Sequence, residues 1–187
     1  MNQDMTALGM LELSSIGVAL AVEDAMLKAA DVRLLIARTI CSGKYMIMVG
    51  GDTTEVQASV KAGEENSMEA LIDSLVIPQV DKRLFPAISG VAELKDEDRD
   101  ALGVLEAFSV TAIIEGADAA VKAADVKLFK IHVAMAIGGK GFLLLCGALS
   151  DVEAAIEAGA REIGKRGLLV SRVVIPRPEP ELFQDLI

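Results

Sequence analysis

Few residues in this sequence could do chemistry. There are two cysteines, Cys41 and Cys146, and a single histidine, His132. A thiolate can ligate iron or zinc, and an imidazole can act as a base or bind a metal. The cysteines show no C-x-x-C spacing, and no acid or nucleophile stands at a recognisable spacing from His132. We therefore predict a structural histidine, a core position for Cys146, and no catalytic centre.

Two short turns hold the other candidate residues. One reads CSGK at 41–44, and the other reads GGKG at 138–141. Each turn stands between two apolar runs, which predicts a β-hairpin. Taken locally, such a segment is typical of an ordinary hairpin turn with a solvated lysine. What else the turns do depends on the elements that position them.

An internal duplication relates the two turns. The segment LGMLE at 8–12 recurs as LGVLE at 102–106, an offset of 94. Gly43-Lys44 then matches Gly139-Lys140 at an offset of 96, and VIP at 76–78 matches VIP at 174–176 at 98. A collinear series at this long period indicates two homologous domains, because solenoid repeats are shorter. We predict a first domain at residues 1–90, a linker at 91–100 and a second domain at 101–187.

Both copies predict the same order of elements, β-α-β-β-α-β, the split-βαβ or ferredoxin-like arrangement. This is an α+β fold, with a four-stranded antiparallel sheet and both helices on one face in each domain. The first helices are expected at 18–30 and 114–124. The second helices are expected to begin near Thr53 and Ser150, which could serve as N-caps. Strands are expected at 8–13, 33–40, 45–50 and 74–77, and at 102–108, 127–136, 142–146 and 168–175.

The composition argues against several classes of partner. A net charge of −10, no tryptophan and 3% aromatic residues disfavour nucleic acid as a ligand. The longest stretches without a charge are ten residues, against about 20 for a membrane span, so we expect no membrane association. The opening residues MNQDMTALG predict no secretory signal, and the cysteine usage fits a reducing cytosol.

The repeated motifs resemble a known family. LGMLELSSIG at 8–17, DAMLKAADV at 24–32, the SGK turn and VIPRP at 174–178 resemble the bacterial microcompartment shell domain. Two unpermuted copies resemble its tandem-domain, trimeric class from propanediol-utilisation compartments. The resemblance implies a structural protein of the cytoplasmic compartment shell, and not an enzyme. Two similar domains need only a three-fold rotation to complete a six-membered ring.

The same resemblance implies partners and an assembly. Three chains would form a pseudohexameric trimer that tiles a facet beside other hexameric and pentameric shell proteins, around enclosed enzymes. Lys28, Lys122 and Arg177 occupy positions of contacts between neighbouring hexagons, although Gln79 replaces the arginine in the first copy. The plain alternative for the lysines is a cation favoured by the dipole of a helix C-terminus.

The two turns are the implied lining of a central pore for small molecules. Glycines there would let backbone N–H groups face polar or anionic solutes. Because the turns differ between copies, the opening should have three-fold chemistry. The implied pore residues are Ile40, Cys41, Ser42, Gly43, Lys44, Ala136, Ile137, Gly138, Gly139 and Lys140.

An iron–sulfur cluster is implied for some tandem members, on the trimer axis. Ile113 stands at the position that the resemblance assigns to the ligating cysteine, and isoleucine cannot ligate iron. We therefore expect no cofactor and no metal site. Three Cys41 thiols near the axis leave a cluster-binding redox relay open as an alternative function. A third hypothesis is an oligomeric enzyme or effector-binding module on the same scaffold, which hosts many functions.

Overall fold

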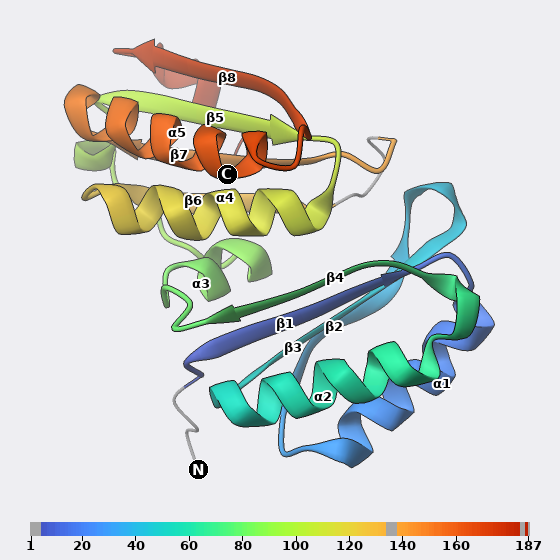
Figure 1. Cartoon of the computed structure of the whole chain (residues 1–187). Helices are drawn as coiled ribbons and strands as arrows, with labels where there is room; N and C mark the ends of the chain where they lie inside the picture. Colours follow the sequence, from blue (N-terminus) through green and yellow to red (C-terminus); the bar gives the residue numbers. More distant parts are fainter. Residues whose placement is uncertain (1–4, 134–137, 184–185, 187) are drawn as a thin grey trace. The chain divides into compact units, whose positions relative to one another are not determined.

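The fold divides into two compact units, Met1–Val80 and Asp81–Ile187. The computed structural model describes residues 5–133, 138–183 and 186. Each unit holds a four-stranded antiparallel sheet with two long helices on one face (Figure 1). The predicted α+β fold is confirmed in both copies.

In the first unit the strand order is β2-β3-β1-β4. The central strand β1 pairs antiparallel with β3 and β4, so that Leu8 lies opposite Gly50 on one side and Ile77 on the other. The elements are β1 (Ala7–Leu13), α1 (Ile16–Ala29), β2 (Arg33–Ile40), the 3-10 turn η1 (Cys41–Gly43), β3 (Lys44–Gly51), α2 (Thr53–Asn66), η2 (Met68–Ala70) and β4 (Leu71–Pro78).

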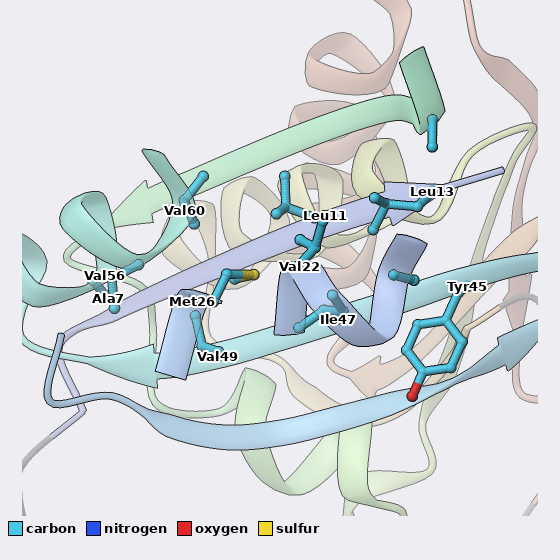
Figure 2. Packing of buried hydrophobic residues seen from close by; sticks show 12 residues of the cluster. Ala7, Leu11, Leu13, Val22, Met26, Tyr45, Ile47, Val49, Val56 and Val60 are labelled. Atoms are coloured by element: carbon cyan, nitrogen blue, oxygen red, sulfur yellow. The ribbon is translucent and has the colours of Figure 1, made fainter. Parts of the chain in front are cut away.

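The core of the first unit lies between its sheet and its helices. Alternation along β1 points Ala7, Leu11 and Leu13 toward the helices, where each is fully buried. Figure 2 shows these side chains packed with Val22 and Met26 of α1. The intervening residues of β1 point to the opposite face of the sheet, and Glu12 is one of them.

The second unit repeats this topology with the strand order β6-β7-β5-β8. The elements are α3 (Leu84–Ser89), η3 (Asp96–Asp98), β5 (Ala101–Ala107), α4 (Val110–Ala123), β6 (Lys127–Val133), β7 (Gly141–Gly147), α5 (Leu149–Gly164), β8 (Leu169–Pro176) and η4 (Pro180–Phe183). In both units, no helix of the described ranges is long and apolar enough to cross a membrane.

The predicted helix starts were partly wrong. Helix α4 begins at Val110, four residues before the predicted start, because Ser109 caps it by accepting a hydrogen bond from the Ala112 N–H. Helix α2 is capped by Asp52, and Thr53 is already helical. Helix α5 has no side-chain cap, and Ser150 lies inside it.

The segment between the repeats is more ordered than its charged composition predicts. Residues 84–89 form helix α3, and Ala92 and Leu94 pack against a buried cluster that includes Phe183. The compact units divide between Val80 and Asp81, ten residues before the predicted end of the first domain, because residues 81–100 pack within the second unit.

Candidate functional site

The first predicted pore turn joins β2 to β3. Residues 41–43 form η1, and Gly43 has a φ of +74°, a left-handed conformation that favours glycine. Nothing lies within 4 Å of the place where a Cβ would stand on Gly43, so backbone conformation is what favours glycine there. Ile40 is buried and Cys41 is half-buried. The turn therefore presents a thiol and backbone groups at one end of the sheet.

Lys44, the last of the predicted pore residues in the first turn, forms an ion pair with a glutamate. Its Nζ lies 2.7 Å from Oε1 of Glu12 on the neighbouring strand β1. The Glu12 side chain is only 5% exposed, whereas that of Lys44 is 32% exposed. A buried carboxylate is costly without a partner, so this pair fixes the turn to the central strand.

The second predicted turn has the same anchor. Lys140 Nζ lies 2.5 Å from Oε1 of Glu106 on β5, and the Ser171 hydroxyl donates to the other carboxylate oxygen at 3.2 Å. The hydrogen bond from Lys140 holds the pKa of Glu106 below its ordinary value, although partial burial opposes this. Ala136 and Ile137 lie outside the described residues. Gly138 and Gly139 both have left-handed φ values, +67° and +83°.

Sequence reasoning missed these two glutamates as partners of the turns. Glu12 and Glu106 end the matched segments LGMLE and LGVLE, and each precedes a matched Gly-Lys turn. A charged residue at the same place in two buried strands was the available signal, because a buried charge needs a partner. We call the pairs Glu12–Lys44 and Glu106–Lys140 the turn anchors.

Behind the turns the two domains are filled differently. Tyr45 follows Lys44 in the first domain and points into the core cluster, while its hydroxyl donates to Oε2 of Glu23 at 3.2 Å (Figure 2). Burial, and then the Glu23 charge, raise the pKa of Tyr45. The matching residue of the second domain is Gly141, where a Cβ would come within 2.8 Å of Ile113 Cγ2.

Ile113 is therefore a packing residue. It is fully buried in α4 and occupies space beside Gly141 that a larger residue at 141 would need. Its counterpart in the first domain is the small Ala19, in the same cluster as Tyr45. A hydrocarbon side chain at this position offers iron no ligand.

The predicted lattice lysines differ in their surroundings. Lys28 pairs with Asp24 across one helical turn at 2.6 Å, and both side chains are mostly exposed, 74% and 61%. Lys122 makes the matching contact with Asp118 at 2.5 Å, but Asp118 is only 11% exposed. Arg177 is exposed, with a φ of +46° that is matched by +53° at Gln79.

The remaining chemical residues lie in the core or on the sheet. Cys146 is fully buried, and burial raises the pKa of its thiol to about 12. The His132 ring stacks on Phe142 with 4.9 Å between the centroids. Over the described ranges, no group of three or more His, Cys, Asp or Glu side chains could hold a metal ion within one chain.

Comparisons with known proteins find the repeat again. The model of the BMC domain matches residues 7–80 and 101–178. Bacterial microcompartment shell protein PduT of Citrobacter freundii is 42% identical over 181 residues, which cover 97% of this chain and 97% of that protein. Bacterial microcompartment shell protein EutM of Salmonella typhimurium is 42% identical over 83 residues, which cover 44% of this chain and 84% of EutM.

A solved structure resembles the whole chain. A microcompartments protein from Desulfitobacterium hafniense DCB matches with a TM-score of 0.90 at 40% identity. The match covers 95% of this chain and 98% of that chain. The similarity therefore extends over both copies of the repeat.

Proposed function

Because this chain belongs to the BMC domain family and is a structural protein of a bacterial microcompartment shell, we propose that three copies close into a pseudohexameric ring around a pore. Such a ring tiles a facet of the shell beside other shell proteins, and its pore passes small molecules. The role is structural and not catalytic. The ring follows from symmetry, since three chains supply six similar domains.

The observation that carries this proposal is the recurrence of the turn anchors. Both domains place a Gly-Lys turn at the same end of the sheet, and both hold it with a carboxylate from the central strand. Two such turns per chain give six positions around one axis after a three-fold rotation. A pore rim needs fixed turns, and the turn anchors fix them.

The pore then has alternating chemistry. Three copies of the turn that holds Cys41 and Gly43 alternate with three copies of the turn that holds Gly138 and Gly139. Glu12 and Glu106 compensate the charge of the two lysines, so the rim presents backbone N–H groups and thiols more than bare ammonium groups. Polar and anionic metabolites of small size are the solutes that such a rim favours.

Crosslinking through Cys41 tests the ring. In the ring three Cys41 thiols surround one axis, whereas Cys146 is fully buried and does not compete. A short bis-maleimide should link wild-type chains and Cys146→Ser chains, which are seen as dimers on a denaturing gel. The Cys41→Ser variant is the control and should give monomers only. Equal crosslinking with and without Cys41, or a wild-type mass other than three chains by light scattering, would contradict the proposal.

The edge of the ring carries Lys28, Lys122 and Arg177 in contacts between neighbouring hexagons. The double change Lys28→Ala/Lys122→Ala should leave the trimer intact, because the ion pair that each lysine forms in the described part of the chain lies within its own helix. We expect the protein concentration needed for sheet formation to rise by about fivefold, since each ring loses six cations. Electron microscopy of a dilution series measures this. Undiminished sheets would remove the lattice role.

A second candidate function is a redox relay on an iron–sulfur cluster bound by three Cys41 thiols. The observation in its favour is a half-buried thiol in the proposed pore turn. Thiolates are the ligands that hold such clusters. Iron analysis and visible absorption of anaerobically purified protein decide between the pore and the redox relay. Coloured protein that contains iron, together with a Cys41→Ser variant that lacks both, supports the relay. Colourless protein without iron contradicts the relay.

A further inference from the structure

The outer face of the first domain exposes large apolar side chains. Ile16, Leu20 and Leu27 of α1 are 43%, 55% and 39% exposed, and Leu34 near the start of β2 is 37% exposed. Arg33 beside them is exposed and forms no ion pair within the described part of the chain. We call these five residues the α1–β2 surface. Helix α1 and strand β2 contact each other, and large apolar side chains that are exposed on adjoining elements mark an interaction site.

The second domain buries the same positions. The counterparts of the four apolar residues, at an offset of 94, are Val110, Ile114, Val121 and Leu128, and none is more than 2% exposed. The two domains have the same fold and similar side chains here. The two domains therefore differ in whether other residues cover this face, and not in how apolar the face is.

The residues that follow the last strand of the first domain cover part of that face in the second unit. The Asp81 N–H donates to Asp118 Oδ1 at 2.8 Å. Arg83 donates to the carbonyl oxygen of Val121 at 2.5 Å and to that of Val126 at 3.3 Å. Helix α3, which begins at Leu84, packs against β6 and α4. This covering segment satisfies one carbonyl in the last turn of α4 and one between α4 and β6, and its own Leu84 is completely buried.

An equivalent segment follows the last strand of the second domain. At the offset of 98 found for the final strands, Asp81 matches Glu179, and Leu84-Phe85 matches Leu182-Phe183. Leu182 is 41% exposed, whereas Leu84 is fully buried. Glu179 and Glu181 are exposed and form no ion pair among the described residues. Their carboxylates complement the unpaired Arg33.

We propose that the α1–β2 surface docks a second copy of this chain, which covers it with the segment 179–183 after its own β8. The inference rests on the proposed ring and identifies the contact that closes it. The contact is head-to-tail, because each chain offers one uncovered α1–β2 surface and one segment that has a Leu182 to bury. Leu182 packs among Leu27 and Leu34, and the glutamates lie beside Arg33.

Two single changes test the two sides of the contact. Leu34→Asp and Leu182→Asp each place a charge in the apolar contact, which should weaken each interface by about 30-fold or more. Sedimentation velocity at micromolar concentration should show folded monomers for both, with wild-type circular dichroism. Met68→Asp, at an 82% exposed residue outside this surface, is the matched control and should stay a three-chain particle. Variants that remain three-chain particles would overturn the proposal.

Mixing the two variants gives a sharper result. Leu34→Asp keeps an intact segment and Leu182→Asp keeps an intact surface, so an equimolar mixture should form particles of two chains that cannot close. A mixture that stays monomeric would contradict the head-to-tail contact. A wild type that is itself monomeric would instead contradict the proposed ring, which separates the two failures.

Charge reversal tests the same contact without touching a partly buried residue. Arg33→Glu and Glu181→Arg should each lower the fraction of three-chain particles several-fold, because each places like charges together. The double variant Arg33→Glu/Glu181→Arg should recover most of it. No change in either single variant, or no recovery in the double variant, would count against this docking site.

Discussion

The two domains share strand order and pairing register, yet they fill the space behind the turn in opposite ways. In the first domain the large side chain is on the strand, Tyr45, and the helix supplies Ala19. In the second domain the large side chain is on the helix, Ile113, and the strand supplies Gly141. In each domain a small residue on the facing element leaves room for the large one, as close packing of an interior requires.

The ion pair that holds the turn is the same in both domains, whereas the exposure of the outer helix face differs between them. The turn anchors recur with nearly equal lengths, 2.7 and 2.5 Å. The outer helix face is exposed in the first domain and buried in the second. Duplication thus allows each copy to keep the hairpin and to change the face that meets a neighbour.

The largest effect is expected where the two turn anchors differ in burial. Lys44→Ala leaves the carboxylate of Glu12 buried without its cation, which should cost about 3–5 kcal/mol of unfolding free energy. Lys140→Ala should cost only about 1 kcal/mol, because Glu106 is more exposed and keeps the hydrogen bond from Ser171. Urea unfolding at one protein concentration measures both.

A double variant checks the cause of that loss. Replacing both members, Glu12→Leu/Lys44→Met, removes the unpaired charge and should recover most of the stability. Equal losses for Lys44→Ala and Lys140→Ala would mean that burial of the carboxylate does not set the strength of the anchor.

A somewhat smaller effect is expected from making the second domain resemble the first. Gly141→Tyr forces a side chain into the space of Ile113 and should cost about 3 kcal/mol. Adding Ile113→Ala reproduces the Ala–Tyr combination of the first domain and should recover at least half of the loss. Thermal unfolding of the two variants measures this. If Ile113→Ala made the loss larger, the idea of exchanged volumes would be wrong.

The smallest effect is expected on the stability of the second domain in acid. The pKa of Glu106 is lowered from 4.5, first by the hydrogen bond from Lys140. A carboxyl with a lowered folded-state pKa stabilises the fold above its unfolded pKa, and this contribution is lost as the pH falls through the folded value. Glu106→Gln should therefore lower the urea midpoint at pH 7 and differ progressively less from wild type below about pH 4.5. A difference that stays constant across this range would contradict the assignment.

Much of this architecture could be predicted from the internal repeat, because matched apolar runs fix the order of strands and helices. Helix starts were harder, since Asp52 and Thr53 are both good caps and only the backbone conformation selects Asp52. The repeated glutamates indicate that each needs a partner, but the sequence does not identify Lys44 as that partner, because the register that brings Glu12 beside Lys44 depends on how β1 pairs with β3. Helix α3 was missed because it is only six residues long and contains Pro86, a residue that usually interrupts helices.

Electron cryomicroscopy of the assembled protein would show the ring and its centre. We expect discs of three chains with a central hole, bordered in alternation by the turn at 41–44 and the turn at 138–141. The density around the hole should have three-fold symmetry, with Cys41 at every second position. A particle whose two turns lie away from the axis, or whose centre is filled by packed side chains, would contradict the proposed ring.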